Sequence, residues 1–304
     1  MQKIFLFLAI TSNFLFANQS AVYLNEDREP CDIYVPNKIP LFGDLHVHTA
    51  LSLDANTQGT LNSPDDAYRY AKGQKLYLQP YNEDKTSSRI SKLNQPLDFA
   101  AVTDHAELLG EVRLCLDPLS AKYNGLQCRA YRNFPKLSYF YMNAKASMNK
   151  PLRMCGDSRE ICLEAAEEPW QEILQAAEEH YDRTKACKFS TFIGYEWTGA
   201  VYSGNNLHRN IIFDSSNVPY QPISFYEAPT RSELWEQLDQ KCSNDCNYIV
   251  IPHNSNLSNG FMFEKPNQEE IYLQNTREPL VEIFQHKGSS ECSIDPNDPL
   301  CSFE

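Results

Sequence analysis

The chain has 304 residues, of which 42% are hydrophobic and 22% charged, so it can form one barrel-sized domain or two smaller ones. Its formal net charge of −13, without clustered lysine and arginine, argues against a nucleic-acid-binding surface, because neutralising phosphates requires such clusters. The composition is compatible with a solvated, exported enzyme.

Residues 1–17 have the pattern of a secretory signal peptide. Lys3 precedes a short apolar core, and the small residue Ala17 offers a cleavage point. Polar residues interrupt the apolar run before it reaches the roughly 20 residues that a membrane-spanning helix needs. No cysteine lies at the cleavage point for a lipid anchor. We therefore expect signal removal, no membrane anchor afterwards, and a periplasmic or secreted location.

The chain contains ten cysteines, and an export signal favours disulfide bonds between them. Eight of them form close pairs in the sequence: Cys115 with Cys128, Cys155 with Cys162, Cys242 with Cys246, and Cys292 with Cys301. On this pairing Cys31 and Cys187 are left to join each other, although spacing alone cannot determine connectivity. A structural zinc site is the alternative, but no Cys-x-x-Cys pair occurs.

The first half of the chain predicts alternating strands and helices. A polar arm over residues 18–40 leads to a strand over 41–48, which is followed by a helix that Ser63 caps and that runs to about Lys72. The apolar run Leu97–Thr103 predicts a strand buried on both faces. Residues from about 115 to 165 are irregular and aromatic, and we interpret them as an insertion stapled by cysteines.

The second half continues the alternation. Its pattern predicts helices over 167–182 and 230–241, and strands over 189–197, 205–213, 248–254 and 280–286. Strands that alternate with helices and end in polar residues indicate an α/β fold whose site lies at the carboxyl ends of the strands.

Gly43-Asp44-Leu45-His46-Val47-His48-Thr49 ends the first predicted strand. Side chains alternate in an extended segment, so His46 and His48 emerge on one side and can reach the same cation. Asp54 follows six residues after the second histidine. Taken alone, such a pair can equally be structural, so the remaining histidines decide between the two interpretations.

Five of the seven histidines lie at or near predicted strand ends, namely His46, His48, His105, His253 and His286, while His208 opens a strand. The acids Asp44, Asp54, Asp104, Glu196 and Glu282 accompany them. This mixture of nitrogen and oxygen ligands suits zinc, manganese or iron better than calcium or magnesium. Glu196 can bridge two cations, which would generate hydroxide from a shared water and so favours a hydrolase.

Motifs for competing chemistries are absent from the sequence. It contains no Gly-x-Ser-x-Gly, no Gly-x-x-x-x-Gly-Lys and no Gly-x-Gly-x-x-Gly. The serine hydrolase, nucleoside-triphosphatase and dinucleotide-binding interpretations therefore lack their motifs.

Five motifs in order resemble the polymerase-and-histidinol-phosphatase (PHP) superfamily of metal-dependent phosphoesterases: Gly-Asp-Leu-His-Val-His-Thr, Ala-Val-Thr-Asp-His, Gly-Tyr-Glu-Trp-Thr, Pro-His-Asn and Val-Glu-Ile-Phe-Gln-His. The surrounding sequence looks like an exported branch classed as a domain of unknown function. The resemblance covers residues 41–304 and implies a distorted (β/α)7 barrel with two or three divalent metal ions. It also implies three ligand groups, formed by His46 and His48 with Glu196, by His208 and His253 with Glu196, and by Asp54 with His105.

One departure from the family pattern concerns the C-terminal end. The family closes its site with a later Asp-x-His, and none follows His286. The candidate acids there, Glu291, Asp295 and Asp298, have no histidine beside them. We therefore expect a truncated fragment whose barrel is incomplete at the C-terminus and whose metal binding is impaired, and the roles of Glu282 and His286 stay open.

The resemblance suggests a small-molecule phosphate ester as the substrate. Arg209 beside His208 is the preferred phosphate contact, with Lys287 or Asn254 as further candidates, because a guanidinium can grip phosphate with two hydrogen bonds. Asp104 is a candidate to orient His105 or to move a proton, and backbone capping is its alternative role. Two other functions remain open: a non-catalytic metal-binding or scaffold module, and the same chemistry on a non-phosphate ester or amide.

Overall fold

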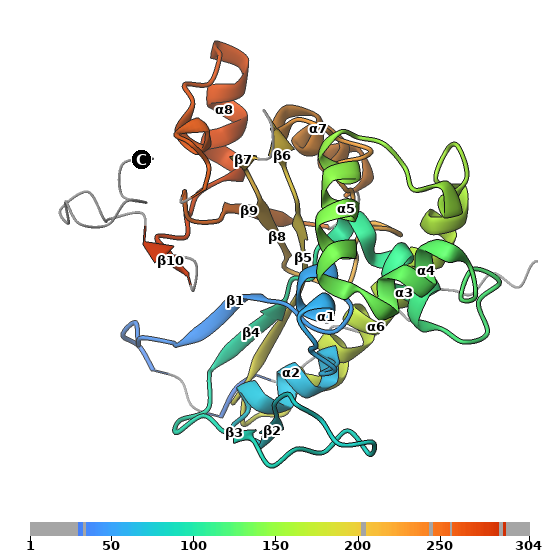
Figure 1. Cartoon of the computed structure of the whole chain (residues 1–304). Helices are drawn as coiled ribbons and strands as arrows, with labels where there is room; N and C mark the ends of the chain where they lie inside the picture. The colour runs from blue at the N-terminus through green and yellow to red at the C-terminus, as the bar shows by residue number, and fades with distance from the viewer. Residues whose placement is uncertain are drawn as a thin grey trace, which may run out of the picture.

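The computed structural model describes residues 30–32, 35–201, 205–242, 246–255, 257–285 and 288–289. At its centre lies a sheet of five strands in the order β1-β4-β5-β8-β9 (Figure 1). The strands are β1 (Gly43–Val47), β4 (Phe99–Val102), β5 (Ser190–Trp197), β8 (Arg209–Phe213) and β9 (Tyr248–Pro252). Each of them falls within a segment predicted to be a strand.

The sheet is mixed and curls into a half-barrel. β1, β4 and β5 run parallel to one another, whereas β8 runs antiparallel to both of its neighbours, β5 and β9. The start of β8 consequently lies at the same edge of the sheet as the ends of the other four strands. The structure is thus α/β, but a (β/α)7 barrel is not confirmed.

Helices surround the sheet, and short strand pairs and 3-10 turns connect the larger elements. The helices are α1 (Leu53–Thr57), α2 (Pro64–Ala71), α3 (Leu109–Leu116), α4 (Leu126–Asn133), α5 (Pro135–Ser147), α6 (Glu160–His180), α7 (Arg231–Lys241) and α8 (Gln268–Arg277). The 3-10 turns are η1 (Ala106–Leu108), η2 (Arg153–Cys155) and η3 (Phe261–Phe263). The antiparallel pairs are β2 (Leu76–Tyr77) with β3 (Ile90–Ser91), β6 (Ala200–Val201) with β7 (Asn205–Asn206), and β10 (Phe284–Gln285) with β11 (Gly288–Ser289).

Two helices begin where their sequences predict. Ser63 caps α2 and Thr230 caps α7, each in a capping box with an acid three residues later. In both boxes the hydroxyl accepts from the backbone of the acid, whose carboxylate accepts from the backbone of the capping residue, so two N–H groups are satisfied at once. Both predicted starts are confirmed.

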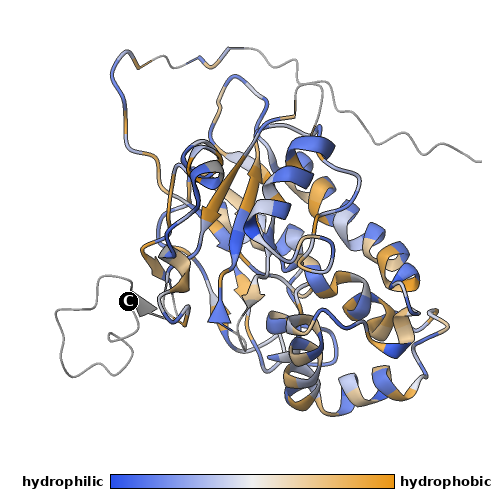
Figure 2. Cartoon of the chain, turned by 90° about the horizontal axis from the view of Figure 1, so that it is seen from above, coloured by the Kyte–Doolittle hydropathy of each residue, from blue (hydrophilic) through white to orange (hydrophobic). Residues whose placement is uncertain are grey.

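The main core lies between the outer face of the sheet and the helices α2, α6 and α7. Alternate strand residues such as Ile193, Tyr195 and Ile211 point into it, where they pack against Trp170 and Trp235. Figure 2 shows apolar residues concentrated on the central strands. The inner face carries a much smaller apolar cluster of Ala101, Ile212 and Ile251. The inner face therefore has room for polar side chains at its carboxyl edge.

The sequence pattern of about 115–165 predicts an irregular region. In the structure this region is largely helical. Its helices α4 and α5 have a core of their own, in which Tyr131, Met142 and Ala146 pack with Leu53 and the cysteines. Many of its aromatic and apolar residues remain exposed, so the helical period is not visible as a simple apolar stripe. This packing against α1 stabilises helices that the sequence pattern does not reveal.

Two further predicted elements have different limits in the structure. α6 begins at Glu160, seven residues earlier than expected, and continues through Pro169. The pattern of 280–286 predicts a strand, but the segment contributes only β10, which pairs with β11 and not with the main sheet. Tertiary packing therefore overrides the local pattern at both places.

Four disulfides join Cys31 to Cys187, Cys115 to Cys128, Cys155 to Cys162 and Cys242 to Cys246. All four pairings agree with the sequence analysis, and disulfides are typical of an oxidising, extracellular environment. The predicted signal peptide 1–17, Cys292 with Cys301, and His286 lie outside the described residues. No helix in the described ranges combines the length and apolarity that crossing a bilayer requires.

Candidate metal centre

The predicted ligands meet at one edge of the sheet. His46 lies in β1 and His48 directly after it, Glu196 lies near the end of β5, and His253 follows β9. His208 precedes β8, and the antiparallel direction of that strand brings it to the same edge. His208 therefore lies beside residues at the ends of the parallel strands, although it precedes its own strand.

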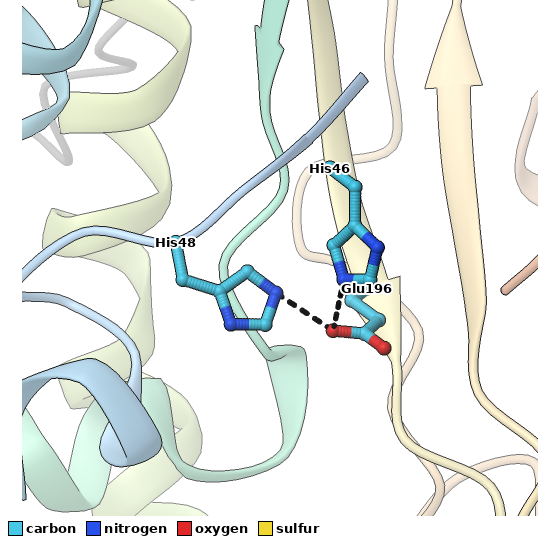
Figure 3. A group of neighbouring side chains, drawn as sticks. All are labelled: His46, His48 and Glu196. Carbon is cyan, nitrogen blue, oxygen red and sulfur yellow. Dashed lines mark ion pairs between the residues drawn. The ribbon is translucent and has the colours of Figure 1, made fainter. Parts of the chain in front are cut away.

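Glu196 is fully buried at the middle of the cluster. Three imidazole nitrogens surround its Oε2, namely His48 Nε2 at 2.8 Å, His105 Nδ1 at 3.3 Å and His46 Nε2 at 3.5 Å. His208 Nδ1 lies 3.0 Å from its Oε1. Figure 3 shows His46 and His48 pointing at the same carboxylate oxygen. One buried carboxylate thus has four imidazole neighbours.

The electrostatics of this cluster demand positive charge. Burial disfavours the charged form of Glu196, but His105 and His46 outweigh it and hold the pKa of Glu196 well below its usual range. Burial likewise opposes the charge on His46, yet Glu196 and Glu282 raise its pKa to about 9. For His105 burial dominates and lowers the pKa to about 3. The neighbouring imidazoles, His46 among them, therefore favour the charged form of the buried Glu196 carboxylate.

Asp54 extends the cluster on the side of His48. Its Oδ2 lies 2.9 Å from His48 Nδ1 and 3.9 Å from His105 Nε2, and its Oδ1 accepts a 2.6 Å hydrogen bond from Ser52 Oγ. Burial disfavours its charge, but His48 and His105 hold its pKa far below the usual range. Asp54 and His105 therefore lie together, as the sequence predicts.

The donor set fits divalent metal ions. His48 Nε2 and Glu196 Oε2 are buried and 2.8 Å apart, yet neither makes a hydrogen bond within the described residues. At this edge of the sheet three groups bring potential ligand atoms within 4.8 Å of one another: His46, His48 and Glu196; His48, Asp54 and His105; and His105, Glu196 and His208. The groups share members, so they form one connected cluster of nitrogen and oxygen ligands, of a type that suits zinc, manganese or iron.

The comparisons with known proteins place the chain in a family. The model of the family described as "Protein of unknown function (DUF3604)" matches residues 35–304. The chain belongs to the DUF3604 family. Searches of the curated proteins and of the solved structures gave no match.

His253 lies at the margin of the cluster in this DUF3604 protein. Its ring stacks near His46 with centroids 6.0 Å apart and meets the His208 ring edge-on at 4.9 Å. Its Nδ1 lies 2.6 Å from the carbonyl oxygen of Asn254. His253, itself a predicted ligand, thus lies next to the other predicted ligands but belongs to none of the three converging groups.

Hydrogen-bonding groups lie beside the rings of His46 and His105. Glu282 Oε1 lies 2.8 Å from His46 Nδ1, and its Oε2 accepts from the backbone N–H of Asn254. Thr198 Oγ1 lies 2.6 Å from His105 Nδ1. A carboxylate behind a histidine fixes the tautomer of the ring and makes it a better ligand. The sequence assigns no role to Glu282 or to Thr198, although Thr198 ends the motif Gly-Tyr-Glu-Trp-Thr.

Asp104, a predicted catalytic residue, is fully buried and binds Thr49. Its two oxygens accept from the backbone N–H and from the hydroxyl of Thr49, the residue after His48. Burial raises the pKa of Asp104 to about 6. These bonds hold the backbone next to His48. One predicted role of Asp104 was to orient His105, and these bonds do not do so.

Arg209, the predicted phosphate contact, lies on the other face of β8. It is opposite Trp197 in the register, whereas Asn210 is opposite Glu196. Arg209 is buried, and its Nε donates to Glu278 Oε1 at 2.6 Å. Its charge is thus neutralised away from the cluster, and it does not line either cavity at the site.

Two cavities open onto the cluster of the DUF3604 protein. One, of about 550 Å³, is lined by His46, His48, Asp54 and Glu282. The other, of about 500 Å³, lies between α5 and the ligands Asp54, His105 and His208. Within the described ranges neither cavity is lined by a lysine or arginine. The site therefore offers a small molecule access to the ligands from two sides.

Proposed function

We propose that this protein is a metal-dependent hydrolase that holds two or three divalent ions. The residues that would hold them are His46, His48, Asp54, His105, Glu196 and His208, with His253 beside them. The observation that carries the proposal is the buried Glu196 carboxylate with four imidazole nitrogens within 3.5 Å. A purely structural role would not need so many titratable groups around one buried charge.

When bound, such ions lower the pKa of water towards neutrality and polarise the bond to be hydrolysed. Glu196 lies among the ligands of two converging groups and is therefore the candidate bridging residue. Glu282 holds the His46 ring, and Thr198 holds the His105 ring. Asp104 acts at a distance, because it fixes Thr49 and hence the backbone that positions His48.

A phosphate ester is the first substrate class, and it rests on the resemblance to the PHP superfamily. Arg209 is no longer proposed as the phosphate contact, because it is paired with Glu278 on the opposite face. The charge of a phosphate would then be met by the ions. The absence of lysine and arginine among the described lining residues of both cavities favours a second candidate, a non-phosphate ester or amide.

The test is to purify the full chain from an oxidising compartment, measure its metal content, and assay it on phosphate monoesters, phosphate diesters, carboxylic esters and amides. His46→Ala is expected to lose metal and at least about 100-fold in turnover. His180→Ala is the matched control, since His180 lies on α6 and binds Asp65. Full activity in metal-free protein would refute the proposal, and bound metal without turnover would support a binding module.

The proposed location is the periplasm or the cell exterior. Four disulfides support it, because they form and persist in oxidising compartments. The expected removal of residues 1–17 is tested by N-terminal sequencing of the exported protein. A mature protein that retains residues 1–17 would contradict this part of the proposal.

A further inference from the structure

The 500 Å³ cavity has two different walls. The metal-site wall consists of Asp54, His105 and His208, and the facing wall is α5, which contributes Tyr139 and Asn143. α5 belongs to the inserted region and not to the central sheet. A molecule whose reacting bond lies at the ligands would therefore contact α5 with its remaining part.

Tyr139 lies on the face of α5 that points towards the site. Met142 and Ala146, three and seven residues later, are buried against Leu53, the neighbour of Asp54, and Tyr139 packs against the same cluster. The Tyr139 hydroxyl makes no hydrogen bond to the residues that the structure describes. Burial and the charges of Asp54 and Glu196 raise the pKa of Tyr139, so its hydroxyl keeps its proton and can donate.

The wall that carries Tyr139 is firmly attached to the rest of the site. Tyr131 on α4 donates a 2.6 Å hydrogen bond to Asn56 Oδ1 on α1, the helix that also carries Asp54. The Cys115–Cys128 disulfide joins α4 to α3. α5 packs with Leu53 of α1 and with both cysteines of this disulfide in one apolar cluster, so packing sets the position of Tyr139 relative to Asp54.

The lining of this cavity favours an uncharged guest. Apolar side chains, among them Leu53, Leu108 and Phe140, form much of it, and its acids are Asp54 and Glu107. No lysine or arginine lines it within the described ranges. An additional carboxylate or phosphate on the guest would lack a cationic partner and would face these acids.

We propose that this cavity binds the organic group of an ester or amide substrate, that this group is uncharged and partly apolar, and that Tyr139 determines specificity by donating a hydrogen bond to it. The inference rests on the proposed function, because it assumes that the reacting bond lies at the metal ligands. The reacting end of the substrate then lies at the metal-site wall, and Tyr139 contacts its other end.

Two probes of equal shape test this inference by calorimetric titration of the zinc-loaded full chain, independently of turnover. 4-Carbamoylphenylphosphonate carries an uncharged amide, and 4-carboxyphenylphosphonate carries a carboxylate at the same position. We expect the amide probe to bind at least about tenfold more tightly. Tyr139→Phe is expected to weaken binding of the amide probe about three- to tenfold, with zinc content unchanged.

Tyr141→Phe is the matched control, because Tyr141 lines an apolar pocket elsewhere on α5. It is expected to leave both affinities and the zinc content unchanged. Equal binding of the two probes to zinc-loaded protein, or an unchanged preference in Tyr139→Phe, overturns the inference and leaves the proposed function intact. A protein that takes up no zinc overturns the proposed function itself and the inference with it.

Discussion

Replacing Glu282 by glutamine is expected to weaken metal binding while leaving the fold in place. The carboxylate lies 2.8 Å from His46 Nδ1, and its other oxygen accepts from Asn254 N at 2.9 Å. Glutamine converts the first bond from charge-assisted to neutral, which roughly halves its strength, and its NH₂ group cannot accept the second. Loss of such a partner costs about 10–100-fold in metal affinity, or about 1.4–2.8 kcal/mol.

The assay is a competition titration of zinc against a chromogenic chelator, with wild type and variant compared at one pH. Glu264→Gln is the control, because Glu264 is an exposed carboxylate outside both cavities. The control is expected to keep wild-type affinity. If Glu282→Gln binds zinc within about twofold of wild type, the carboxylate does not orient His46 and the reasoning fails.

Three further predictions concern the scaffold around the site. Thr49→Val removes the hydroxyl that binds the buried Asp104, and we expect a loss of about 1–3 kcal/mol in urea unfolding; an unchanged midpoint would contradict this. Burial raises the pKa of Glu107 to about 7, above its unfolded value, so the stability that its proton contributes is present at low pH and lost as pH rises through about 7. Glu107→Gln should flatten the decline in stability of the metal-free protein between pH 5 and 8, and an equally steep decline would exclude Glu107 as its source. Serine at both Cys31 and Cys187 opens a loop of 156 residues, and we expect a loss of roughly 3–5 kcal/mol, measured by unfolding without reductant.

The convergence of most site residues could be predicted from the sequence, because they lie at or near strand ends that meet at one edge of the sheet. His46, His48, Asp54, His105, Glu196 and His208 all lie together in the structure. The starts of α2 and α7 could also be predicted, because Ser63 and Thr230 form capping boxes with residues only three positions away. Both kinds of signal are local.

What could not be predicted depends on tertiary contacts. The direction of β8 depends on its antiparallel pairing with β5 and β9, and the sequence pattern does not show that this pairing brings His208 to the site. The helices α4 and α5 owe their stability to packing against Leu53 and to disulfides. Arg209 beside His208 looked suited to phosphate, but adjacent strand residues point to opposite faces. The buried partner Glu278, 69 residues away, has no sequence signal.

The register of β8 decides whether His208 or Arg209 faces Glu196. Because side chains alternate along a strand, a slip of one residue would turn His208 away and bring Arg209 into the cluster. A guanidinium there would occupy the carboxylate as a permanent counter-ion and compete with metal. The ion pair of Arg209 with Glu278 on the outer face holds β8 against that slip. This ion pair thereby helps to determine which residues of β8 face Glu196, although it does not contact the cluster.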